Sequence, residues 1–503
     1  MTTTLEETKR PPYGIIAILL LGAFISLLNE TLLNVALPSI MKDFDVTAST
    51  VQWLATGYML VNGILIPITA FLIQKFSVRG LFLTAISLFT LGSLMAVLSW
   101  NFPVLLSARV VQASGSAIMM PLLMNVLLNG FPIEKRGAAM GIFGLVMIFA
   151  PAIGPTLSGF LIEHYSWKML FYVTFPIALI ILVVAIFLLH DKKESMPIKL
   201  DGLSVVLSSI GFGGILYGFG TAGDKGWSAT EVYLTLIVGG IALLVFILRQ
   251  LKLDVPMLEF RIYRYPMFAL SSIISITLTM AMFGAMLLLP LYVQTIRGIS
   301  PLDSGLLLLP GALLMGIMSP ITGKLFDKYG ARVLAVTGLT ITILTSYMFS
   351  RLTMDTTYTT LMLLYTARMF GMSMVMMPVM TNGLNQLPAR YNPHGTAMNN
   401  TLQQVSGAIG SALLVTIMST RTTTHIGELA GSGLAGQDLV NQATVEGIND
   451  AFLLTVFVAL IALVLSFFMK RSKPGEDFRD QKVASKEREE DQDQSDMEPA
   501  SQV

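Results

Sequence analysis

Two charged side chains lie deep inside apolar segments that are long enough to cross a membrane. Glu30 belongs to the segment 13–37, and Arg109 lies at a similar depth in the segment 102–129, which runs in the opposite direction. At a rise of about 1.5 Å per helical residue, both lie roughly 10 Å from the same membrane surface. An ionisable group at that depth costs at least about 2.5 kcal/mol on insertion scales, so both residues are predicted to be functional.

A carboxyl group in this setting can carry protons. Burial favours the neutral acid and a neighbouring arginine favours the carboxylate, so a small rearrangement between the two helices can load or release a proton. We therefore predict that Glu30 and Arg109 meet across the interior and form a proton-coupling pair. The alternative is a fixed ion pair that only holds two helices together.

Arg368 holds the matching position in the segment 359–382, but no acid accompanies it, because 285–291 is wholly apolar. Proton handling is therefore expected in the N-terminal half. Arg368 is expected either to line a substrate cavity or to bond the carbonyls and amides of neighbouring helices.

Membrane helices must position these residues. With 54% hydrophobic and 13% charged residues, the chain of 503 residues has too little polar surface for a water-soluble particle of its size. The sequence predicts an all-α integral membrane protein with 14 transmembrane helices, the first of them uncleaved. The apolar stretches, each about 20 residues or longer, lie near 13–37, 50–73, 80–98, 102–129, 138–162, 167–189, 201–222, 230–249, 267–293, 304–325, 331–350, 359–382, 395–419 and 450–470.

The distribution of Lys and Arg predicts the orientation. Cytoplasmic loops are enriched in basic residues, and most of the basic residues fall on the side of the N-terminus, so both termini are expected in the cytoplasm. Residues 1–12 then form a cytoplasmic N-terminus, 420–449 an outer loop that is either mobile or a short surface helix acting as a lid, and 471–503 a disordered cytoplasmic tail. The outer side carries only Lys42, Lys168, Lys225, Arg297, Arg351 and Arg421.

The two halves of the chain repeat a pattern. Pro67-Ile68-Thr69 recurs as Pro320-Ile321-Thr322, and the surroundings of Arg109 recur around Arg368. Both copies run in the same direction, which predicts two similar six-helix bundles related by an axis normal to the membrane. The bundles are expected at 13–189 and 267–470, with two inserted transmembrane helices at 201–249.

Such a pair of bundles encloses a central site that is reached alternately from each side as the halves rock. This geometry suits a transporter. A receptor or scaffold built from the same helices is the alternative, but it leaves the buried charges without a purpose.

The segment 150–159 places two prolines among small residues, which removes backbone donors and permits close helix contact and a bend. Ordinary helix packing is the alternative. The residues predicted to form this hinge are Pro151, Gly154, Pro155 and Gly159.

The charged turn 323–332 is predicted to form a cytoplasmic gate, in which Asp327 can pair with a base or with a helix N-terminus. The first-half copy carries Gln74 where the second half has Asp327, so the gate is expected to be asymmetric. The predicted gate residues are Gly323, Asp327, Gly330 and Arg332.

Polar residues follow one face of the segment 395–419, and amides in a membrane helix must face protein or water. The chain also has 31 methionines, whose flexible, polarizable side chains adapt to varied apolar ligands, although gap filling is the commoner reason for them. The substrate cavity is predicted to be lined by Asn34, Gln112, Met120, Arg368, Met377, Asn399, Asn400 and Gln403.

Four motifs carry a family resemblance. They are the run Leu28 to Pro38, the set Arg109, Gln112, Gly115 and Ala117, the stretch Gly154 to Gly159, and the turn Gly323 to Arg332. In these motifs and in its fourteen helices, the chain resembles the fourteen-helix drug:proton antiporters of the major facilitator superfamily, including the lincomycin-resistance type of exporter. In that family an aspartate usually stands where this chain has Asn29, so the acid is shifted by one position, to Glu30.

The resemblance implies a major facilitator fold and a proton-coupled antiporter that exports small amphipathic or apolar compounds by alternating access. The resemblance also implies multidrug efflux across the cell membrane and, as its result, antibiotic resistance. The implied partners are a small-molecule substrate, protons and the lipid bilayer, with no cofactor. A proton-coupled symporter that imports a nutrient on the same fold remains the alternative.

Other classes of protein fit the sequence poorly. The formal net charge of +1 argues against a nucleic-acid partner. The absence of a phosphate-binding Gly-rich loop argues against an ATP-driven pump. An enzyme is not expected either, because the four histidines have no metal-ligand spacing and the chain has no cysteine.

Overall fold

The computed structural model describes residues 13–46, 48–51, 53–189, 201–430, 436–473 and 475. Within these ranges every regular element is a helix. The first half contains α1 (Tyr13–Asp43), α2 (Ala48–Val51), α3 (Trp53–Lys75), α4 (Val78–Val97), α5 (Phe102–Gly130), η1 (Ile133–Lys135), α6 (Arg136–His164) and α7 (Met169–Leu188).

Two inserted helices, α8 (Gly202–Lys225) and α9 (Thr230–Lys252), come next. The second half contains η2 (Phe260–Arg264), α10 (Pro266–Leu291), η3 (Tyr292–Ile296), α11 (Pro301–Tyr329), α12 (Ala331–Phe349), α13 (Tyr358–Ser373), α14 (Met376–Asn385), η4 (Ala389–Tyr391), α15 (Asn392–Leu429) and α16 (Gly436–Ser466).

The predicted membrane segments correspond to these helices. In the described residues, 13 helices are long and apolar enough to cross a membrane, and α10 contributes a shorter apolar stretch, Pro266–Met282. The helix ends follow local chemistry: Asn101 accepts a hydrogen bond from the backbone of Val104 at the start of α5, and Thr357 accepts one from Thr360 at the start of α13. These two caps begin the two helices that carry Arg109 and Arg368.

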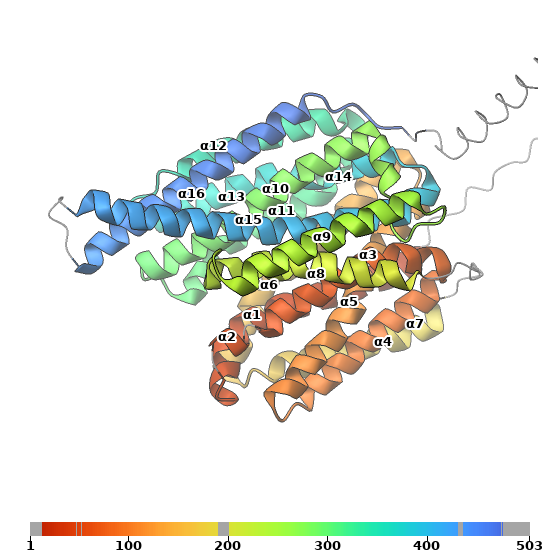
Figure 1. Cartoon of the computed structure of the whole chain (residues 1–503), viewed down its shortest axis with the longest axis horizontal. Helices are drawn as coiled ribbons and strands as arrows, with labels where there is room; N and C mark the ends of the chain where they lie inside the picture. The colour runs from red at the N-terminus through yellow and green to blue at the C-terminus, as the bar shows by residue number, and fades with distance from the viewer. Residues whose placement is uncertain are drawn as a thin grey trace, which may run out of the picture.

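The long helices run side by side along the length of the molecule, and α1 begins at the same end of the molecule at which α16 finishes (Figure 1). We call this end the terminal face and the opposite end the far face. The two halves meet along two seams, where α6 contacts α11 and α3 contacts α15. The inserted helices pack on each other, and α8 contacts both α3 and α15. The insertion therefore covers one seam.

Three boundaries differ from the sequence-based expectation. The stretch expected as an outer loop, 420–449, is helical up to Leu429 and again from Gly436, because both membrane helices continue beyond the bundle. The segment expected as one helix at 359–382 divides into α13 and α14 around Met374. The tail from 471 begins with an ordered stretch, Arg471–Lys473 and Gly475; the rest of the tail and residues 1–12 lie outside the described residues.

Candidate functional site

Arg109 is the centre of a buried polar network in the first half. Its guanidinium donates to Asn29 Oδ1 (2.5 Å), to Gln112 Oε1 (3.0 Å) and to the carbonyl of Leu54 (3.4 Å), and it lies 4.1 Å from the centre of the Tyr58 ring. Only 1% of Arg109 is exposed. Four different partners from α1, α3 and α5 thus hold the charge in place.

The predicted direct pair between Glu30 and Arg109 is not formed in the described structure. Arg109 bonds the neighbouring residue, Asn29, which in turn donates to Thr174 of α7 (3.4 Å). Consecutive residues of a helix point about 100° apart, so only one of the two α1 side chains can face Arg109. Glu30 is partly exposed and makes no hydrogen bond or ion pair in the part of the chain described. Its carboxyl group lies beside the network rather than inside it.

The predicted hinge packs against α1 next to Glu30. A Cβ on Gly154 would overlap the side chain of Thr31, and Ser158 donates to the carbonyl of Leu32 (2.6 Å). α6 is one continuous helix through this stretch, and the side chain of Pro155 lies outside the described part. Gly159 has open space around it, and Pro151 is partly exposed. The small residues therefore serve a close contact between α1 and α6.

Arg368 repeats the burial of Arg109 without its partners. It is fully buried, and it donates to the Ser346 hydroxyl and to the carbonyl of Ala281 (3.0 Å). These bonds join α13 to α10 and α12, and a place for Arg368 in the substrate cavity stays a prediction.

The predicted cavity residues separate into two groups. Met120 and Gln403 are partly exposed. Buried contacts occupy the others: Gln112 donates to Ser93 (2.9 Å), Asn399 contacts Met380, Asn400 bonds the carbonyl of Thr396, and Met377 packs near Gly144. The side chain of Asn34 lies outside the described part.

The predicted gate residue Asp327 connects the two halves at the terminal face. Its carboxylate accepts hydrogen bonds from the backbone amides of Gly137 and Ala138, each at 3.0 Å, at the first turn of α6. A helix N-terminus has unpaired amides and a partial positive charge, so it binds a carboxylate well. The contact is tight, because a Cβ on Gly323 would overlap the backbone of Gly137. We call this arrangement the terminal gate.

The other predicted gate residues have lesser roles. Gly330 adopts a φ of +81° between α11 and α12, a conformation that favours glycine. Arg332 is exposed and makes no hydrogen bond within the residues described.

The first-half copy makes a weaker, related contact. Gln74, which stands where the second half has Asp327, lies 3.0 Å from the Nε2 atom of His394 in the first turn of α15. Because α15 is the repeat counterpart of α6, both turns reach toward the same kind of helix start. The two contacts differ in charge, because Asp327 contributes a carboxylate and Gln74 a neutral amide.

Further contacts between the halves gather at the terminal face. Arg136 donates to Asn385 Oδ1 (3.3 Å), Asn392 donates to Asn129 Oδ1 (2.7 Å), and Ser319 donates to the carbonyl of Gly141 (2.9 Å). The halves are therefore closed against each other at this end.

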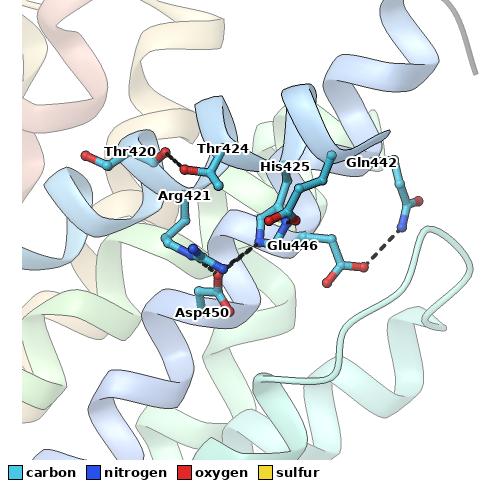
Figure 2. Close-up of polar contacts among 8 residues, drawn as sticks. Thr420, Arg421, Thr424, His425, Gln442, Glu446 and Asp450 are labelled. Atoms are coloured by element: carbon cyan, nitrogen blue, oxygen red, sulfur yellow. Dashed lines mark hydrogen bonds and ion pairs between the residues drawn. The ribbon is translucent and has the colours of Figure 1, made fainter. Parts of the chain in front are cut away.

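Sequence reasoning missed a charged cluster on the far-face extensions of α15 and α16 (Figure 2). Arg421 Nε lies 2.5 Å from Asp450 Oδ2, and the His425 ring lies 2.9 Å from Asp450 and 2.8 Å from Glu428. The partners are far apart in sequence, and the only available signal was the spacing of Arg421, His425 and Glu428 on one helix face. The cluster joins the two extended helices.

Comparisons with known proteins agree with this architecture. The family model described as Major Facilitator Superfamily matches residues 19–411. The uncharacterised MFS-type transporter YcnB of Bacillus subtilis (strain 168) is 49% identical, over 95% of this chain and 99% of its own length. The lincomycin resistance protein LmrB of the same strain is 45% identical, over 94% of this chain and 98% of its own length.

A solved structure shows the same fold. The human organic anion transporter MFSD10 (TETRAN) gives a TM-score of 0.63, with 90% of this chain and 100% of that chain covered, at 13% identity. The family model and the two bacterial relatives cover most of the chain. The chain therefore belongs to the Major Facilitator Superfamily and is a multi-pass membrane transporter rather than an enzyme.

Proposed function

We propose that this protein is a proton-coupled antiporter that exports small amphipathic or apolar compounds from the cytoplasm. The observation that carries the proposal is Glu30, an acid within the membrane bundle that follows directly on Asn29 of the Arg109 network and is itself not bound by an ion-pair partner in the described residues. The relatedness to lincomycin resistance protein LmrB supports drug-like substrates and export.

In this proposal the terminal face is the cytoplasmic side and the far face is the outside, as the distribution of Lys and Arg predicts. The closed terminal face then corresponds to a transporter that is shut toward the cytoplasm. A proton enters from the outside and neutralises Glu30, which favours its transfer into a less polar setting against α6. Release of the terminal gate lets the halves rock, the proton leaves to the cytoplasm, and the substrate takes its place.

The direction of transport tests the proposal. Inside-out vesicles that contain the protein should accumulate a fluorescent apolar drug when their lumen is acidified, and drug addition should release protons from the lumen. Vesicles with the protein but without a pH gradient are the control. Accumulation of the drug only with the opposite gradient would indicate the alternative, a symporter that imports its substrate.

A further inference from the structure

A short segment that begins four residues after Ser466, the last residue of α16, forms an ordered strap on the terminal face. We define the strap as Lys470–Lys473 and Gly475. Ser472 is 7% exposed, and the preceding residue, Met469, is 1% exposed and belongs to the apolar core of the second half. A stretch that composition alone marks as polar tail is therefore packed against the bundle.

One side chain of α14, Asn382, and the backbone of the residue that follows this helix, Gln386, bind the strap. Asn382 donates to the carbonyl of Lys470 (3.0 Å) and accepts from the amide of Ser472 (3.1 Å), so its amide group pairs with the strap backbone on both sides of Arg471. One turn later, the carbonyl of Gln386 accepts from the amide of Gly475 (2.8 Å). Asn382 is itself 1% exposed, so the side chain that binds the strap belongs to the protein interior.

Gln386 also binds the start of α10. The side chain of Gln386 accepts from the amides of Met267 (2.6 Å) and Phe268 (3.2 Å), and the amide of Lys470 lies 3.3 Å from the sulfur of Met267. The strap joins α14 and α10, and it contributes only backbone groups to these contacts.

Arg471 extends from the strap to the terminal gate. Its guanidinium donates to the backbone carbonyl of Asp327 (2.7 Å), in the last turn of α11, while the Asp327 carboxylate holds the first turn of α6. A cation at a helix C-terminus binds unpaired carbonyls and is favoured by the helix dipole. Asp327 is therefore held by the strap through its backbone carbonyl, and it binds the other half through its carboxylate.

We propose that Arg471 is a positioning residue of the terminal gate, and that the strap stabilises the closed terminal face by fixing the end of α11. This inference rests on the proposed gating role of Asp327. Detachment of the strap would leave the last turn of α11 free to fray, and the Asp327 carboxylate would lose its alignment with the α6 amides.

The test compares two variants with the same loss of charge. Arg471→Ala removes the contact with Asp327, whereas Lys473→Ala is the matched control, because Lys473 is exposed and makes no hydrogen bond in the described residues. The chain has no cysteine, so Ser319→Cys supplies a single reporter at a site that is 1% exposed and faces Gly141 of α6. Its reaction with N-ethylmaleimide in membrane vesicles measures opening of the terminal face.

We expect Arg471→Ala to increase the labelling rate of the reporter by about threefold or more, the effect of losing one partly exposed hydrogen bond to a charged group. Lys473→Ala should leave the labelling rate unchanged. Arg471→Lys should keep the labelling rate close to that of the parent protein, because a lysine can also donate to the carbonyl. Equal rates in Arg471→Ala and Lys473→Ala would overturn the inference.

Transport measurements separate this inference from the proposed function. Labelling of the reporter needs no substrate and no proton gradient, so it reports the strap even if the protein is not a drug exporter. Where transport is measurable, Arg471→Ala should change kcat more than KM. Unchanged kcat together with a raised KM would place Arg471 in the substrate path and contradict a positioning role.

Discussion

Glu30 is the residue on which the proposed proton coupling depends. Glu30→Gln keeps the shape of the side chain but cannot release a proton, so we expect gradient-driven export to be lost while the protein remains folded and inserted. Drug-driven proton release from the purified protein measures this directly. Glu163→Gln is the matched control, because Glu163 is an exposed acid on α6. Full drug-driven proton release by Glu30→Gln would refute the assignment.

Asp327 carries the terminal gate through two backbone hydrogen bonds. Asp327→Asn removes the charge at the α6 N-terminus, and its amide oxygen is a weaker acceptor. We expect turnover to fall about threefold to tenfold, since one such interaction contributes about 0.5–1.5 kcal/mol, while substrate binding changes less. Asp303→Asn, at the exposed far end of the same helix, should have little effect. Lost binding with unchanged turnover per bound substrate would place Asp327 in the binding site instead.

At the scale of elements, an ion pair fastens α8 to α9 at the terminal face. Arg249 Nε lies 2.8 Å from Asp201 Oδ2, and the hydrogen bond from Arg249, followed by one from Ser204, lowers the pKa of Asp201 to about 2. Because the pKa is lower in the folded protein than in the unfolded chain, the pair stabilises the fold fully above about pH 4 and loses its effect as the pH falls toward 2.

The thermal unfolding of Asp201→Asn should therefore differ from that of the parent protein by a constant amount between pH 5 and pH 9. The difference should shrink below pH 4, where the parent also loses the charge. A difference that varies across the neutral range would mean that another titrating group controls this end of the helices.

We expect the outer surface of the inserted pair to face lipid or another subunit. Ile237, Ile241 and Leu244 of α9 are each more than half exposed, and membrane helices expose such residues to acyl chains. Apolar substitutions there, such as Ile241→Val, should leave the range of exported compounds unchanged, even where expression falls. Resistance profiles of cells with matched protein levels measure this. An altered range of compounds would place the pair in the transport path.

At the scale of the whole molecule, the sequence predicts most of the architecture, because apolar length and the internal repeat are properties of the chain itself. It cannot place Arg109 against Asn29 rather than Glu30, since neighbouring positions differ only in angle around the helix. It also misses the Arg421–Asp450 contact and the strap, because both depend on pairing between distant polar segments that have no apolar periodicity.

The position of α8 makes the two seams mechanically unequal. This helix contacts α3 and α15 together: Trp53 stacks on Tyr217, and beyond α8, Trp227 donates to Thr416 (2.6 Å) of α15. Because α8 holds the seam between α3 and α15, we expect the two halves to pivot about this seam and to separate at the seam between α6 and α11. When the terminal face opens, spin labels placed across α6 and α11 should therefore separate further than labels placed across α3 and α15, and the interior should be exposed to one side of the surrounding lipid before the other.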